Sequence, residues 1–192
     1  MGPALLVLGL AAVMSLGLPA LDSETAYGDQ VHNGDLAEIA DGITLVPASG
    51  WDLASGALAG QARSPVGTAA TTELVFGSVT LFVQAAPFAG TPSALLTRII
   101  RINDDLHNAR GRAAGMTGRY AVRTRQGVVG VAKDFAGVAR QGSVVAFVFR
   151  PRERSAGSQG EGVEIVAAGP IGAISRRRHD IVAMIRSIRT AS

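Results

Sequence analysis

The chain of 192 residues contains no cysteine. This absence excludes a disulfide scaffold, a thiolate metal site, a cysteine nucleophile and an acylated-cysteine anchor. The nucleophile-elbow, P-loop and dinucleotide-binding motifs are also missing, and the three histidines, His32, His107 and His179, are scattered along the sequence. Aromatic residues make up only 5% of the chain and do not alternate with basic ones, which argues against nucleic-acid binding. We therefore expect a protein that is not an enzyme and has no cofactor.

What the chain does contain is typical of a folded domain with many turns. Apolar residues make up 47% of the sequence and charged residues 17%, well outside the range of disordered chains. Glycine occurs 24 times without a collagen period, and proline only 8 times. The length suits about one domain.

Charge is distributed unevenly, although the net charge of +3 looks ordinary. Residues 1–97 carry one basic group, Arg63, against eight acids, whereas residues 98–192 carry 17 basic groups against seven acids. A strongly basic half favours an anionic partner, either a lipid headgroup or an acidic protein surface.

The N-terminal segment 4–21 is free of charge. Eighteen helical residues span roughly 27 Å, enough for the hydrocarbon core of a bilayer. A cleaved signal peptide would need a basic start and a good cleavage site, and the chain offers only Leu18-Pro19-Ala20. We therefore favour an uncleaved transmembrane signal anchor over residues 1–21, with a buried helix of a soluble protein as the other alternative. Ala11 and Ser15, four residues apart, could let another membrane helix approach.

The flank that follows sets the expected topology. Seven acids and no lysine or arginine occur from Asp22 to Asp52, and a flank without basic residues is tolerated on the exported side of a membrane. We expect an acidic linker over residues 22–42 and a domain over residues 43–192 outside the cytoplasm. The predicted location is the cell membrane, with a single N-terminal span.

Short apolar runs separated by glycine-containing turns predict an antiparallel sheet. Gly77-Ser78 and Gln126-Gly127 are hairpin signals. Helical spacing predicts one helix from Thr91-Pro92 to about Gly111 and a second over 171–188. The expected fold class is α+β, with two helices packed on the sheet. The predicted strands cover residues 43–47, 51–54, 71–76, 79–85, 118–125, 128–135, 143–150 and 162–168.

Two segments resemble the PsbP/Mog1-like domain. The sequence DGITLVPASGW at 41–51 is similar to its first strand, and GVEIVAAGP with RRRHDIVAMIRSI, within 162–188, is similar to its last strand and C-terminal helix. The resemblance implies a mostly non-catalytic role, such as photosystem assembly, binding of small GTPases, or accessory work in the cell envelope that includes lipid transport. It carries no catalytic residues over to this chain. The excess of arginine over lysine, together with the anchor, suggests an actinobacterial, mycobacterial-type protein.

Two groups of arginines are the candidate partner-binding residues. Arg176, Arg177 and Arg178 form the densest positive cluster, on the second predicted helix. Arg119, Arg123 and Arg125 alternate along a predicted strand and so share one face of the sheet. The alternative in both cases is an ordinary solvated face, with arginine stems covering apolar surface.

The pair Asp104 and His107 and the single Trp51 could each have either a functional or a structural role. Asp104 and His107 lie three apart on the first helix and could ligate a metal, but a site needs at least one more ligand, and we favour a solvated polar helix end. Trp51, the only tryptophan, could line a groove or anchor the core, and we favour the core.

The leading functional hypothesis is a non-catalytic accessory or assembly subunit of an integral membrane complex. The alternative is a lipid or small-molecule binding module that uses a cleft between the sheet and the C-terminal helix, with Arg176, Arg177 and Arg178 at its rim. An enzyme of unknown type is the third possibility.

Overall fold

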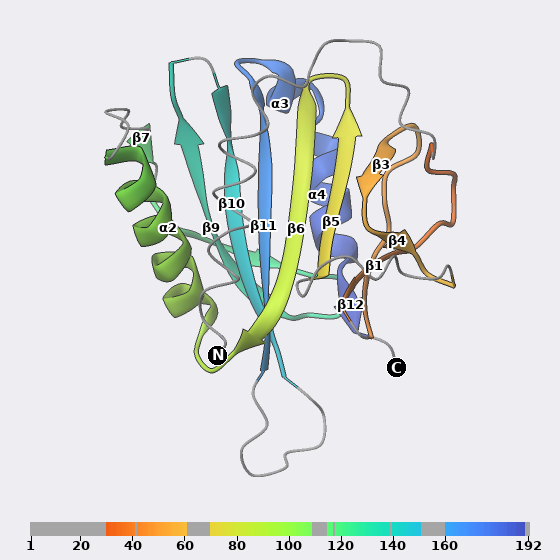
Figure 1. Ribbon diagram of the computed structural model, residues 1–192, viewed down its shortest axis with the longest axis horizontal. Coiled ribbons are helices and arrows are strands. Elements are labelled where there is room, and N and C mark those ends of the chain that lie inside the picture. The colour runs from red at the N-terminus through yellow and green to blue at the C-terminus, as the bar shows by residue number, and fades with distance from the viewer. Residues whose placement is uncertain are drawn as a thin grey trace.

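The computed structural model describes residues 30–40, 42–60, 70–108, 115–116, 118–138, 140–150 and 160–190. Its centre is an eight-stranded antiparallel sheet, the main sheet (Figure 1). In spatial order its strands are β3 (Asp52–Ser55), β5 (Ala70–Phe76), β6 (Val79–Phe88), β11 (Gly160–Pro170), β10 (Arg140–Phe149), β9 (Val129–Ala136) and β7 (Gly115–Met116), while β8 (Tyr120–Arg123) also pairs with β9.

A second, smaller sheet packs beside one face of the main sheet. Its order is β12 (Arg189–Thr190), β2 (Ile43–Leu45), β1 (Ala37–Ala40) and β4 (Ala57–Leu58). A hydrogen bond from the hydroxyl of Thr72 in β5 to the carbonyl of Glu38 in β1, 3.1 Å long, links the two sheets.

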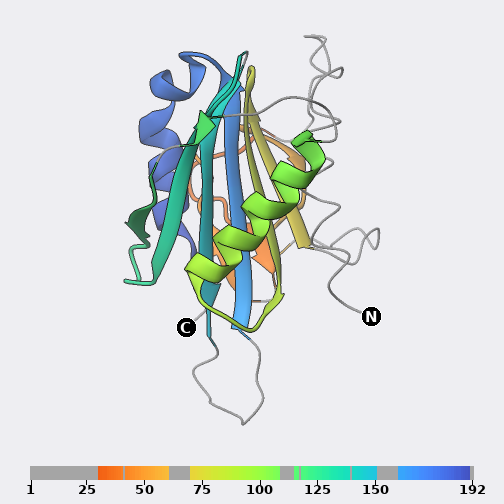
Figure 2. The ribbon, with the colours of Figure 1, turned by 90° about the vertical axis from the view of Figure 1, so that its left-hand side faces the viewer.

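Helices cover both faces of the main sheet. α2 (Pro92–Asn108) crosses one face, and α3 (Ala173–Arg176) and α4 (Arg178–Ser187) lie on the other (Figure 2). The helix begins where the sequence predicted, and Thr91 caps it, because its hydroxyl accepts the Ala94 N–H at 3.2 Å. Alternation along the strands gives each face its own core: in β11, Val163 and Ile165 face the α4 side, and Val166 belongs to the cluster under α2.

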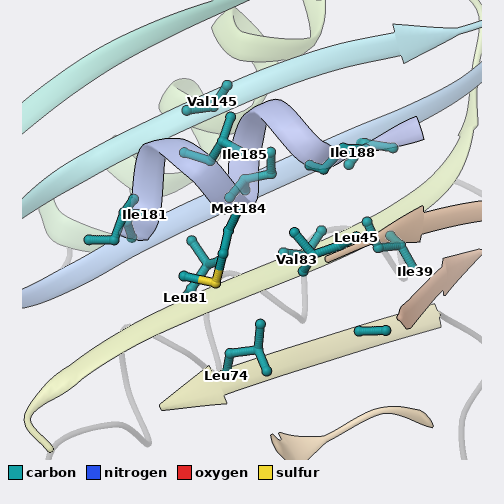
Figure 3. Close-up of a cluster of buried hydrophobic side chains, with 14 of the residues drawn as sticks. Ile39, Leu45, Leu74, Leu81, Val83, Val145, Ile181, Met184, Ile185 and Ile188 are labelled. Atoms are coloured by element: carbon teal, nitrogen blue, oxygen red, sulfur yellow. The ribbon is translucent and has the colours of Figure 1, made fainter. Parts of the chain in front are cut away.

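The larger of the two cores lies under α4. Ile181, Met184, Ile185 and Ile188 approach apolar residues of the sheets in Figure 3. The helical stripe that the sequence predicts at these positions is therefore the buried face of α4.

The second predicted helix is interrupted. A single helix was expected over 171–188, whereas α3 ends and α4 begins at Arg177, whose φ is −105° and ψ is 8°. Gly172, at a φ of +81°, precedes α3 in the left-handed region that favours glycine. The sequence pattern missed the break because the apolar spacing continues across it.

The predicted acidic linker over 22–42 is wrong in its second half. Val31, Ala37 and Ile39 are almost fully buried, and β1 lies between β2 and β4 in the small sheet. The folded domain therefore includes residues 30–40 and does not begin at 43. The acidic composition concealed a short strand in which buried apolar residues flank the half-exposed Glu38.

Trp51 is fully buried, and its ring lies 5.9 Å from that of Phe76. The prediction of a core anchor is confirmed, and a role for Trp51 in lining a groove is wrong. Over the part of the chain that the structure describes, no helix has the length and apolar character needed to cross a membrane. The span predicted for residues 1–21, with Ala11 and Ser15, lies outside that part.

Candidate functional site: a basic cleft beside the C-terminal helix

A cleft of about 710 Å³ opens between one end of the main sheet and the helices α3 and α4. Strands β8, β9 and β10 form one wall, and α3 and α4 form the other. The apolar lining residues are Met116, Val122, Phe135, Val145, Ile174, Ile181, Val182 and Ile185, and the polar ones include Tyr120, Arg123, Asp134, Gln141, Ser143, Ser175, Arg178 and Arg186.

The alternation of strand residues places the sheet side chains in this cleft. Tyr120 and Val122 in β8 are two apart, as are Ser143 and Val145 in β10, so each pair faces the same side of the sheet. Tyr120 pairs with Ala132, which puts Asp134, two residues further along β9, diagonally across from it. A polar group and an apolar group therefore stand side by side on each strand.

Tyr120 forms the centre of the polar part. Its hydroxyl donates a 2.7 Å hydrogen bond to Oδ1 of Asp134. Partial burial raises the pKa of Tyr120 to about 12, the bond to Asp134 and the charge of Asp134 add to this rise, and a hydrogen bond with Ser143 and the positive charge of Arg178 oppose it. The phenol keeps its proton at neutral pH, so Tyr120 can hydrogen-bond a ligand but cannot act as a base.

The cleft has an excess of positive charge. Arg178 and Arg186 line it from α4, Arg123 borders it at the end of β8, and Asp134 is the single acid in its described lining. The Arg123 guanidinium donates a 3.2 Å hydrogen bond to the Gly127 carbonyl. This charge favours an anionic group, which the flat guanidinium can hold through two parallel hydrogen bonds.

The three consecutive arginines take three different positions. Arg176 and Arg178 are both exposed, but only Arg178 belongs to the described lining of the cleft. The guanidinium carbon of Arg177 lies 3.6 Å from the centre of the Phe76 ring, and its Nη1 is 3.4 Å from Oδ2 of Asp180. The cluster disperses because neighbouring residues of a helix point in directions about 100° apart.

The predicted row of arginines on one face of a strand also does not form. Arg119 donates a 2.8 Å hydrogen bond to the hydroxyl of Thr97 in α2. Arg123 lines the cleft, and Arg125 follows the end of β8 and donates its backbone N–H to the Arg186 carbonyl at 2.7 Å. The alternating pattern is real, but the strand is too short to hold all three.

Sequence reasoning missed Tyr120, Asp134, Ser143 and Arg186 as site residues. Tyr120 lay within a predicted strand, and its two-residue spacing to Val122 was a usable signal for a shared face. Nothing in the sequence indicated that Asp134 or Ser143 would meet Tyr120, because this depends on the pairing register of three strands. Arg186 could be identified as a site residue only from the position of α4 on the sheet.

A second polar group lies outside the cleft, in the middle of the main sheet. Glu164 in β11 pairs with Gln84 in β6, and each side chain is only 1% exposed. One carboxyl oxygen of Glu164 and the amide oxygen of Gln84 have no hydrogen-bond partner. Burial raises the pKa of Glu164 to about 8.

Within the described residues, no group of three or more histidine, aspartate or glutamate side chains could hold a metal ion. The side chains of Asp104 and His107 lie outside the described residues. Metal ligation by this pair at the end of α2 therefore stays a hypothesis from the sequence.

Comparison with known proteins gives one informative finding. No family model matches the chain, and no curated protein sequence does. Among solved structures, the chain is similar to the solution structure of cyanobacterial PsbP (CyanoP) from Synechocystis sp. PCC 6803, with a TM-score of 0.53 and 13% sequence identity. The match covers 83% of this chain and 95% of that one. The chain therefore has a PsbP-like α+β fold, which confirms the fold that the sequence resemblance implied.

Proposed function

We propose that this protein is a non-catalytic accessory or assembly subunit of a membrane complex in the cell envelope. Residues 1–21 would anchor it as a single span, and the PsbP-like domain would stand outside the cytoplasm. The fold supports this role by analogy, as the resemblance to the PsbP/Mog1-like family implied. The observation that carries the proposal is the PsbP-like fold of the domain, and the chemistry of the cleft supports its non-catalytic part.

The cleft is better suited to holding a charged group than to transforming one. The high pKa of Tyr120 keeps its hydroxyl protonated, and arginine does not release its proton in proteins. Asp134, the acid in the described lining, already accepts the hydrogen bond of Tyr120. General acid–base catalysis needs a group whose pKa lies near the working pH, and neither the arginines nor Tyr120 can supply one.

Co-purification from native membranes tests the accessory role. We expect tagged full-length protein, extracted gently, to bring down a partner in a fixed ratio. Recovery of the protein alone, as a monomer, would contradict the proposal.

Two variants locate the contact with that partner. If deletion of residues 1–21 abolishes capture, the membrane helix makes the contact, and the double substitution Ala11→Leu with Ser15→Leu should weaken it by blocking close helix approach. If capture persists after the deletion, the domain makes the contact, and the arginines on its surface are the next residues to substitute.

A second candidate function, binding of a lipid or small molecule, is favoured by the size and position of the cleft. The volume of about 710 Å³ lies within the range of small-molecule sites. The cleft lies between the sheet and the C-terminal helix, the position in which the sequence analysis expected a binding cleft. Of the three arginines expected at the rim, Arg178 is in the lining.

A further inference from the structure

We propose that the cleft binds a small anionic amphiphile, with its phosphate or carboxylate head beside Arg178 and its apolar chain between the sheet and α4. This inference rests on the second function above, small-molecule binding in the cleft, and adds the chemical class of the ligand and its orientation.

The head position follows from the groups that surround Arg178. Arg178 of α4 lines the same cleft as Tyr120 of β8 and Ser143 of β10. Its positive charge acts on the Tyr120 hydroxyl and lowers the pKa of that group. Arg178 forms no ion pair with any carboxylate in the described part of the chain, whereas its neighbour Arg177 is paired with Asp180. The Tyr120 hydroxyl donates its proton to Asp134, so the guanidinium of Arg178 is the group that would bind the anion. A guanidinium can hold a phosphate or carboxylate through two parallel hydrogen bonds.

The orientation follows from the layout of α4. Beyond Arg178, the helix presents Ile181, Val182 and Ile185 to the cleft, and Val122 and Val145 line the opposite wall. A chain that leaves the head position along the helix therefore meets apolar side chains on both sides. Val182 is 42% exposed, so an apolar chain would cover surface that now faces water.

The charge selects an anion over a cation or a neutral head. Three arginines and one aspartate line the cleft. All three arginines are exposed, so their attraction for an anion should weaken as the salt concentration rises. A cationic amphiphile of the same chain length would meet repulsion from the same groups.

The test uses the full-length chain in nanodiscs of zwitterionic lipid, with empty nanodiscs as the blank. Hexyl phosphate and hexanoate, two water-soluble probes, are titrated by calorimetry, next to hexanol, hexyltrimethylammonium and inorganic phosphate. We expect saturable binding of the two anionic amphiphiles, at least about tenfold weaker binding of hexanol, and none of the cation. Inorganic phosphate should bind at least about tenfold more weakly than hexyl phosphate.

Two pairs of variants test the position of the ligand. Arg178→Gln should weaken the binding of hexyl phosphate at least about tenfold. Arg176→Gln, at an equally exposed arginine outside the described lining, should leave it unchanged. Val182→Ser should weaken hexyl phosphate but not inorganic phosphate. Val129→Ser, at a similarly exposed valine outside the described lining, should change neither. Circular dichroism of each variant checks that the fold is retained.

Several results would overturn the inference. No binding, equal losses from Arg178→Gln and Arg176→Gln, or hexanol binding as tightly as hexyl phosphate would each do so. Equal affinity for inorganic phosphate and hexyl phosphate would show a site for the free anion without the chain. Failure here leaves the accessory role standing, because that role is tested by co-purification of a partner and does not require a ligand in the cleft.

Discussion

At the scale of single residues, the most demanding position in this fold is the buried Glu164. It lies on the central strand β11 with Gln84 beside it on β6, and water does not reach either side chain. An ionised carboxylate without a partner is costly in such a place, and burial therefore raises the pKa of Glu164 to about 8. At pH values below this, the group is a neutral acid, which is the form that the sheet tolerates.

This pKa makes a prediction about stability and pH. Between the ordinary glutamate pKa of 4.5 and about 8, the folded state holds one proton more than the unfolded state. The contribution of Glu164 is therefore fully present below pH 4.5 and is lost as pH rises towards 8, with a slope of about 1.4 kcal/mol per pH unit. We expect Glu164→Gln to remove this slope in urea unfolding measured at several pH values.

The matched control for this prediction lies on the same strand. Glu161 also has a pKa raised by burial, but it is only partly buried, so Glu161→Gln should flatten the pH dependence much less than Glu164→Gln does. Identical pH dependence in the wild type and in Glu164→Gln would show that the carboxyl is ionised or solvated in the folded state.

At the scale of elements, α4 connects the two sheets and forms one wall of the cleft. Its apolar stripe packs in the larger core, between residues of both sheets (Figure 3). At its end, the Ser187 hydroxyl accepts the Val46 N–H at 2.9 Å and donates to the Met184 carbonyl at 2.6 Å. The helix is therefore held to the small sheet through one buried side chain.

Removal of this hydroxyl tests the connection. Ser187→Ala leaves the Val46 N–H without its partner, and we expect the free energy of unfolding to fall by about 1–2 kcal/mol. Ser175→Ala is the control, because Ser175 is exposed on α3, and should change stability by less than about 0.5 kcal/mol. Equal urea midpoints for the two variants would mean that the Ser187 bonds do not hold the helix end.

At the scale of the whole molecule, the fold is a layered structure that includes residues 30–40 of the acidic segment. β1 occupies the middle of the small sheet, and Val31 and Ile39 contribute to the larger core. The acidic part of the chain is thus partly structural, and residues 30–40 cannot serve as a free tether.

Two truncations test this boundary. A fragment of residues 30–192 should fold and unfold cooperatively, because it keeps every described element. A fragment of residues 42–192 loses β1, which leaves β2 and β4 without their shared partner and opens the core at Ala37 and Ile39. We expect it to lose at least half of its stability or to lack a cooperative transition in thermal unfolding followed by circular dichroism. Equal melting temperatures for the two fragments would contradict this boundary.

Local signals predicted the elements well where chain chemistry decides the backbone. Gly77-Ser78 joins β5 and β6, whose last paired residues are Phe76 and Val79, and the Gln126-Gly127 turn joins β8 and β9. The strand at 37–40 was missed because it is short and lies within a segment of acidic composition. The break at Arg177 was missed because apolar periodicity records which residues are buried and does not record a change in helix direction.

The α+β class, the hairpins, the two helical regions and the excess of positive charge in the second half can all be read from the amino-acid sequence, because each depends on residue type and on spacing over a few positions. Which charges meet depends on how the chain folds. The register of β8, β9 and β10 brings Tyr120 to Asp134 and Ser143, and the path of α4 over the sheet brings Arg178 to them while Arg176 stays outside. Contacts between residues far apart in the chain depend on strand pairing and helix placement, which follow from the packing of the whole core and not from any local pattern.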